Sequence, residues 1–226
     1  CRGADGLRLP PRGVDVAAEA DTLLRVAVHP RLVRFLGQAV EGGNTLLLME
    51  FAPLGDLRSH LEEIEDTITP GHRVAMLQQV CAGMEALSAA GLIHRDLALR
   101  NVLLFRYSAE SVTETSVKVT DFGLTVNAYT ATHAYVAGGP RPIRWLAPEA
   151  LQKGRYSEKS DVWAFGVTAW ELLTGGDVPY AFIGSNEAVA ERVCGGERLQ
   201  RPDGCPDALW ALLQRKWAAA PADRPS

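Results

Sequence analysis

The pattern of apolar and polar positions predicts a short strand-containing part followed by a longer, mainly helical part. Apolar positions from Val14 to about Val28 recur near helical spacing, and His29-Pro30 ends that pattern. Two apolar runs follow, at 32–40 and 45–51, and the Gly42-Gly43-Asn44 turn separates them. Strands joined by such a turn form an antiparallel hairpin, which is the structure we expect here.

Helical patterns dominate the rest of the chain. Thr69-Pro70 suits a helix start with proline at its first position, and Gly91 suits its end. A second helix, opening near Asp161 and apolar on nearly every side through Leu173, belongs in the middle of a domain. Shorter helices are expected after Asp56 and over 186–194 and 206–216. In the first helix the expected buried face consists of Val74, Leu77, Val80, Cys81, Met84 and Leu87.

The most informative stretch is His94-Arg95-Asp96-Leu97-Ala98-Leu99-Arg100-Asn101, a polar segment between the apolar runs 92–93 and 102–105. An apolar run, a polar turn and another apolar run predict two short buried strands joined by a functional loop. Asp121-Phe122-Gly123 then follows a third apolar-leaning strand, twenty residues after Asn101.

These two motifs, in this order and with Asn101 five residues after Asp96, resemble the protein-kinase signature. The resemblance implies that Asp96 orients an acceptor hydroxyl and takes its proton. It also implies that Asn101 and Asp121 bind Mg²⁺ ions bridging the phosphates of ATP. Taken alone, Asp96 would suit a turn-forming loop acid equally well, so the signal lies in the combination.

The same octet resembles the protein tyrosine kinases. Serine/threonine kinases typically carry Lys where Ala98 stands, whereas Arg100, four residues after Asp96, matches the tyrosine-kinase form and is implied to act in catalysis. The one departure is Leu99, where that form usually has Ala. The segment 142–149, Pro-Ile-Arg-Trp-Leu-Ala-Pro-Glu, resembles the platform that tyrosine kinases place under the acceptor side chain.

The resemblance also assigns a nucleotide site. Glu19, in the first helical pattern, matches the Glu that pairs with the ATP-anchoring Lys, although a solvated helix-surface Glu is a commoner fate. Met49 matches the gatekeeper, a role compatible with ordinary core packing. The implied ATP-contacting residues are Met49, Glu50, Phe51, Ala52, Gly55, Asp56 at the ribose, and Leu103 beneath the adenine, together with Asn101 and Asp121.

The implied fold class is α+β: a protein-kinase-like bilobal fold with a mostly helical C-lobe and an incomplete N-lobe β-sheet. We expect an irregular segment at 1–13, a partial N-lobe at 14–51 with helix C and strands 4 and 5 of the family, and hinge plus C-lobe at 52–226. No G-x-G-x-x-G segment precedes the first helical pattern, and no Lys precedes Lys118. The chain begins with Cys and stops at Ser226, so we expect a kinase piece truncated at both ends.

Three further expectations concern regulation and stability. Residues 124–144 show little periodicity and match an activation loop. Tyr135 is the first and Tyr129 the second choice for autophosphorylation, and Arg95 is expected to receive the phosphate. Packing of either Tyr on the surface is nearly as good an interpretation. Glu149 is expected to pair with Arg224. Asp161 is expected to accept backbone N–H groups of the loop around Asp96.

Composition limits the function classes. The net charge of −4 without a basic cluster argues against nucleic acid as a partner, and no apolar run approaches the ~20 residues of a membrane span. The four Cys are scattered, which favours reduced thiols in the cytoplasm or at the cytosolic face of a membrane receptor. We expect a monomer whose partners are ATP and protein substrates with Tyr acceptors. The alternatives are a catalytically silent pseudokinase-like scaffold, and a small-molecule kinase, which Arg100 and Trp145 disfavour.

Overall fold

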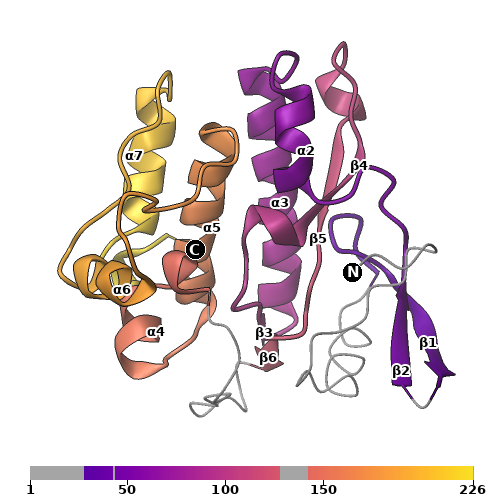
Figure 1. Cartoon of the computed structure of the whole chain (residues 1–226), viewed down its shortest axis with the longest axis horizontal. Helices are drawn as coiled ribbons and strands as arrows, with labels where there is room; N and C mark the ends of the chain where they lie inside the picture. The colour runs from indigo at the N-terminus through magenta and orange to yellow at the C-terminus, as the bar shows by residue number, and fades with distance from the viewer. Residues whose placement is uncertain (1–27, 43, 128–141, 226) are drawn as a thin grey trace.

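The computed structural model describes residues 28–42, 44–127 and 142–225. A mainly helical body occupies most of this part, and a two-stranded hairpin lies beside it (Figure 1). The helix expected over 14–28, and Glu19 within it, lie outside the described residues, as do Tyr129 and Tyr135. No described helix is both long and apolar enough to cross a bilayer.

The expected hairpin is confirmed, with shifted bounds. β1 (Phe35–Glu41) pairs antiparallel with β2 (Asn44–Met49). The apolar run begins at Leu32, but the Val33 amide donates to the Val119 carbonyl at 2.9 Å, so this stretch joins the body before the hairpin starts. Phe51, expected inside the second strand, lies beyond it and is exposed.

The helix start signals are confirmed. α2 (Leu57–Ile64) begins after Asp56, whose Oδ1 accepts the Ser59 amide at 2.9 Å. α3 (Pro70–Ala89) begins after Thr69, which caps it. Gly91 follows its end with φ of +70°, a left-handed conformation that glycine adopts without strain.

The predicted buried face of α3 is partly wrong. Val74 and Cys81 do not belong to it, and Val74 is exposed. Gly83 belongs because α3 approaches the backbone of Arg31 there so closely that a Cβ atom would lie 2.8 Å from its carbonyl oxygen. The side chains that α3 buries are His72, Met76, Leu77, Val80 and Leu87.

Short strands hold the polar loop 94–101. β3 (Leu92–Ile93) precedes it and pairs with β6 (Val126–Asn127), while η1 (Leu99–Asn101) ends it. β4 (Val102–Arg106) then pairs antiparallel with β5 (Ser116–Val119). The two strands expected to flank the loop are therefore both present.

The segment between β4 and β5 packs back onto α3. It contains η2 (Val112–Glu114). The Tyr107 hydroxyl lies 2.9 Å from Thr67 Oγ1, and His72 Nε2 lies 3.0 Å from the Ser108 carbonyl oxygen. Gln79 on α3 donates to the Thr115 carbonyl and accepts from the Val117 amide, which anchors the hairpin end.

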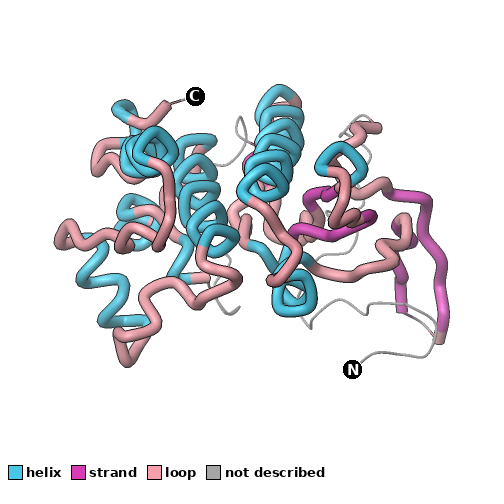
Figure 2. Tube along the Cα trace, turned by 90° about the horizontal axis from the view of Figure 1, so that it is seen from above, coloured by secondary structure: helices cyan, strands magenta, loops and turns pink. Residues whose placement is uncertain are grey.

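The remaining helices form a second group beside α2 and α3 (Figures 1 and 2). α5 (Glu158–Leu173) lies between α3 and α7 (Asp207–Lys216), and it contacts both. The other elements are η3 (Ile143–Trp145), α4 (Pro148–Lys153), α6 (Asn186–Cys194) and η4 (Pro221–Asp223). The expected central helix and the two shorter helices near the end of the sequence are thus present.

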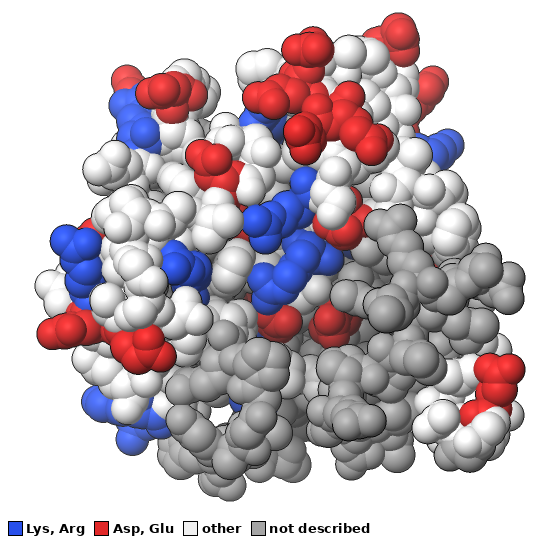
Figure 3. Space-filling model, in the orientation of Figure 1, with Lys and Arg blue, Asp and Glu red and all other residues white. Residues whose placement is uncertain are grey.

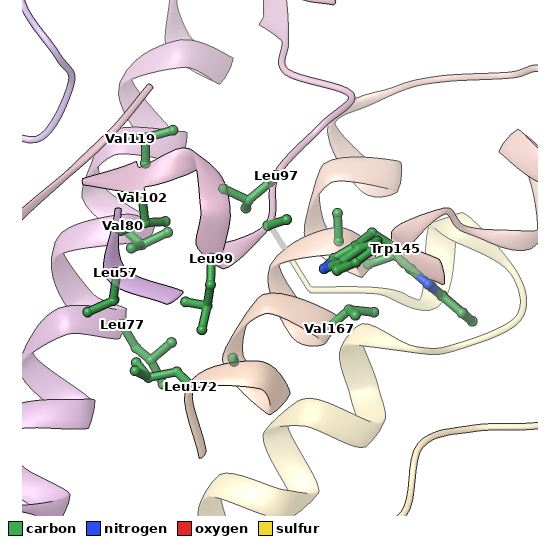
Figure 4. Packing of buried hydrophobic residues seen from close by; sticks show 14 of the residues in the cluster. Leu57, Leu77, Val80, Leu97, Leu99, Val102, Val119, Trp145, Val167 and Leu172 are labelled. Atoms are coloured by element: carbon green, nitrogen blue, oxygen red, sulfur yellow. The ribbon is translucent and has the colours of Figure 1, made fainter. Parts of the chain in front are cut away.

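One apolar cluster joins the two helix groups. Leu99, from the polar loop, is buried beside α2 and α5, and Trp145 packs near Val167 (Figure 4). The loop is therefore embedded in the core at its apolar positions, and its polar His94 and Asn101 are buried as well.

The expected ion pair between Glu149 and Arg224 is confirmed. The Arg224 guanidinium donates to both carboxylate oxygens of Glu149, at 2.7 and 2.8 Å. It also donates to the carbonyls of Ala218 and Lys159 and lies 5.0 Å from the Trp163 ring centroid. The pair ties the last described residues to α4.

Candidate catalytic site

A buried carboxylate fixes the backbone at the start of the polar loop. Asp161, in the first turn of α5, accepts the His94 amide at 2.8 Å on Oδ2 and the Arg95 amide at 3.0 Å on Oδ1. Arg95 has φ of +71°, so the chain turns sharply where these amides converge. Burial raises the pKa of Asp161 to about 7, although the two amides act in the opposite direction.

Asp96 lies at the centre of the loop, with two donors on its carboxylate. The Arg100 guanidinium pairs with Oδ1. The Asn101 side-chain amide donates to Oδ2 at 3.1 Å and to the Asp96 carbonyl at 2.7 Å. The carboxylate is held in one orientation, with 15% of the side chain exposed.

Asp121 is brought to the same place by the β4–β5 pairing. Val102 is opposite Val119, and the Thr120 amide donates to the Asn101 carbonyl at 2.9 Å. Asp121 follows directly, with φ of +67°. Its charge is close enough to raise the pKa of Asp96, so the structure gathers Asp96, Asn101 and Asp121 around one point.

Burial raises the pKa of Asp96 to about 6, and Asp121 adds to the effect while Arg100 opposes it. At neutral pH this carboxylate is ionised, yet it is a better proton acceptor than an ordinary Asp.

His94 supports the loop from inside. Its ring is fully buried and tilted against Phe122, with Nε2 3.1 Å from the Thr120 carbonyl oxygen. Nδ1 accepts the Asp96 amide at 3.2 Å. Burial lowers the pKa of His94 to about 4, so the imidazole is neutral and its proton sits on Nε2, facing the carbonyl.

The segment predicted as an acceptor platform adjoins this site. The Arg100 guanidinium lies 4.6 Å from the Trp145 ring centroid. The Trp145 indole N–H donates to Glu171 Oε2 at 2.7 Å, and the Leu99 amide donates to the same oxygen at 3.1 Å. Arg144 is held away from the site, because it donates to the carbonyls of Pro179, Tyr180 and Ile183.

The segment predicted to bind adenine follows β2. Glu50 Oε1 accepts the Arg34 amide at 2.7 Å and the Lys118 ammonium at 2.6 Å. Its side chain is thus engaged, while the backbone of Phe51 makes no hydrogen bond within the described residues. Met49, which ends β2, is half-buried.

The residues that follow join this segment to β4. Gly55 has φ of +73° and accepts the Leu104 amide at 2.9 Å. Asp56, expected at the ribose, caps α2 and bridges to Leu103. Leu103 is half-buried and opposite Lys118, and its pairing with Asp56 places it beside the segment that follows β2. Ala52 accepts the Gly55 amide at 3.2 Å.

The side-chain oxygens of Asn101 and Asp121 are suitable ligands for a hard cation. Asn101 uses its amide nitrogen for Asp96, and within the described residues neither its oxygen nor the Asp121 carboxylate has a hydrogen-bond donor. Amide and carboxylate oxygens are the ligands that Mg²⁺ accepts, usually with water and phosphate oxygens completing the shell. No group of three or more His, Cys, Asp or Glu side chains in the described part could hold a metal alone.

Charge is unevenly spread over the face seen in Figure 1. Lys and Arg side chains gather in its middle, and acidic side chains gather over α2, whose Glu62 and Glu63 are exposed (Figure 3). The basic centre suits negatively charged ligands.

Sequence reasoning missed Glu171 and Lys118 as parts of this site. Glu171 had a signal, because it is a lone acid deep in a helix that is otherwise apolar. Nothing in the sequence pointed to Lys118, because a Lys in a strand beside apolar residues is as compatible with solvent exposure as with a contact with Glu50.

Comparisons with known proteins agree with this geometry. Residues 11–226 match the family described as protein tyrosine and serine/threonine kinase. The chain therefore belongs to this family of protein kinases, and its helical body with small antiparallel sheets is a kinase fold.

Similar proteins include tyrosine kinases described as inactive and as non-receptor, and a receptor. Human inactive tyrosine-protein kinase 7 is 38% identical over 88% of this chain and 19% of its own length. Human non-receptor tyrosine-protein kinase TNK1 is 42% identical over 97% of this chain and 33% of its own length. Mouse ephrin type-A receptor 1 is 39% identical over 87% of this chain and 19% of its own length. The chain thus spans about a fifth to a third of these relatives.

Proposed function

We propose that the protein containing this chain is an ATP-dependent protein tyrosine kinase, which transfers the γ-phosphate of ATP to tyrosine hydroxyls of protein substrates. The observation that carries the proposal is the Asp96 carboxylate, held by Arg100 and Asn101 beside Asp121. Phosphoryl transfer needs positioned groups and charge neutralisation more than covalent chemistry, and these side chains supply both.

Each residue has a role in this proposal. Asp96 orients the tyrosine hydroxyl and takes its proton, and its pKa of about 6 suits a base working near neutral pH. Asn101 and Asp121 would hold Mg²⁺ through oxygens that have no hydrogen-bond donor among the described residues. Bound Mg²⁺ neutralises the phosphate charge. Arg100 keeps the Asp96 carboxylate in place and borders the acceptor beside Trp145.

The nucleotide is proposed to lie against the segment after β2. The backbone of residues 50–52, in which Phe51 makes no hydrogen bond within the described residues, would bond the adenine edge. Leu103 would lie beneath the ring, and Gly55 and Asp56 would border the ribose. Glu19 is proposed to pair with an anchoring Lys. The sequence holds neither a G-x-G-x-x-G segment nor any Lys before Lys118, so this chain alone should bind ATP weakly.

We propose that the chain consists of an irregular segment at 1–13, a partial N-lobe at 14–51, and a hinge plus C-lobe at 52–226. We propose that the protein acts as a monomer in the cytoplasm or at the cytosolic face of a membrane receptor. The free thiols of Cys81, Cys194 and Cys205 support a reducing compartment.

The test uses the full-length protein with Mg-ATP and a peptide containing Tyr, Ser and Thr. Mass spectrometry should find phosphate on Tyr, and Asp96→Asn should abolish it. Phosphate on Ser or Thr would contradict the tyrosine assignment. Mapping autophosphorylation in the same samples tests Tyr135 and Tyr129.

A second candidate function is a silent scaffold. It is supported by the relative described as an inactive tyrosine-protein kinase. A scaffold should show neither phosphotyrosine formation nor an increase in melting temperature with Mg-ATP, whereas a kinase should show both.

A further inference from the structure

Glu171 is a buried acid that the proposed chemistry does not use. Its side chain is fully buried on α5, ten residues after Asp161. One oxygen, Oε2, accepts both the Leu99 amide at 3.1 Å and the Trp145 indole N–H at 2.7 Å. These donors belong to two segments far apart in sequence, and both segments rest on α5 (Figure 4).

Arg100 lies between those two donors. It follows Leu99 directly, and its guanidinium lies 4.6 Å from the centroid of the Trp145 ring. The same guanidinium pairs with Asp96. The single oxygen of Glu171 therefore fixes both the backbone that carries Arg100 and the ring that supports it.

We propose that Glu171 is a positioning residue: it holds Leu99 and Trp145 at a fixed separation, so that Arg100 stays paired with Asp96 where a tyrosine acceptor would enter. For its catalytic consequence this inference rests on the proposed kinase function. Its structural content, the link from α5 through Trp145 to Arg100, stands independently of activity.

The second oxygen of Glu171 makes the contact between Glu171 and Trp145 measurable by titration. Oε1 is buried and has no hydrogen-bond partner among the described residues. Burial raises the pKa of Glu171 to about 7, while Arg100 from η1 and Arg58 from α2 are the charged groups that favour ionisation. A proton on Oε1 leaves Oε2 free to accept both N–H groups, but it removes the charge that strengthens those bonds. The Trp145 indole should therefore sense this titration.

Steady-state kinetics test the catalytic side. Glu171→Leu leaves two buried N–H groups without an acceptor, and kcat/KM for a tyrosine peptide should fall about 30-fold, about 2 kcal/mol. KM for ATP should stay within about twofold, because the disturbance is on the acceptor side. Glu171→Gln keeps one acceptor oxygen and should recover activity to within about threefold. Thr168→Val, a buried hydrogen-bond loss elsewhere on α5, is the matched control and should leave kinetics unchanged.

Three kinetic outcomes would overturn the inference: an unaffected Glu171→Leu enzyme, a Glu171→Gln enzyme as poor as Glu171→Leu, or a loss that appears equally in KM for ATP.

Spectroscopy tests the link without relying on turnover or on the folding of Glu171→Leu. In ¹⁵N-labelled protein, the Trp145 indole resonance, assigned with Trp145→Phe, should shift with a midpoint near pH 7 and should not titrate in Glu171→Gln. An indole resonance whose position and pH dependence are the same in the wild-type protein and in Glu171→Gln refutes the link. If the wild-type protein forms no phosphotyrosine while the indole titrates as expected, the proposed function fails and the structural link holds.

Discussion

Replacing Glu149 by Gln tests how far one buried ion pair stabilises the domain. The Arg224 side chain is fully buried, whereas 14% of the Glu149 side chain is exposed. Removing one partner of a buried pair costs roughly 3–5 kcal/mol, because the other charge is left uncompensated. Gln retains one acceptor oxygen, and Arg224 keeps the carbonyls of Ala218 and Lys159, so we expect the low end, about 3 kcal/mol.

Urea denaturation measures this change. With an m-value of about 2.5 kcal/mol/M, a loss of about 3 kcal/mol lowers the unfolding midpoint by about 1.2 M at unchanged m. Tryptophan fluorescence and circular dichroism should give the same midpoint. The matched control is Asp207→Asn, which breaks an equally short but exposed pair with Arg201 and should cost less than about 1 kcal/mol. Equal midpoint shifts in the two variants would refute the reasoning, since burial would then not decide the cost.

Three further predictions follow from the site and its support. Because Asp96 has a pKa of about 6, kcat/KM for a tyrosine peptide should fall as the pH drops below about 6; a flat profile from pH 5 to 8 would contradict its role as base. Asp161 has a folded-state pKa of about 7, above its unfolded value of about 3.9, so the folded state binds more protons between these two pH values. The free energy of unfolding should therefore decrease as the pH rises from about 3.9 to about 7. Asp161→Asn should reduce this decrease, as measured by urea denaturation at several pH values. Gly83→Ala should destabilise the protein by about 1–3 kcal/mol despite the better helix propensity of Ala, since its Cβ would lie 2.8 Å from the Arg31 carbonyl oxygen; an unchanged melting temperature would show that this contact relaxes freely.

Local signals in the sequence predicted much of the fold. Thr69-Pro70 and Gly91 mark both ends of α3, because capping and left-handed glycine depend on neighbouring residues only. The pattern could not assign the buried face of α3 correctly. Val74 is apolar yet exposed, and Gly83 is buried because another segment approaches it, which spacing alone does not reveal.

Some contacts of the candidate site could likewise be predicted from the sequence, and others could not. The convergence of Asp96, Asn101 and Asp121 could be predicted, since motif spacing and a strand pairing place them together. The contacts of Glu171 with Trp145 and of Lys118 with Glu50 could not, because each joins segments whose meeting depends on the packed fold.

α5 fixes the spacing between two of the contacts that hold the polar loop 94–101. Asp161 binds the loop at its start and Glu171 binds it at the Leu99 amide, and the ten-residue step from one acid to the other corresponds to about 15 Å of helix. One residue inserted between them would advance the second carboxylate by about 1.5 Å and rotate it by about 100°, away from both of its donors. An insertion or deletion in this stretch would therefore separate one of the two carboxylates from the loop, so the spacing along the helix is itself constrained.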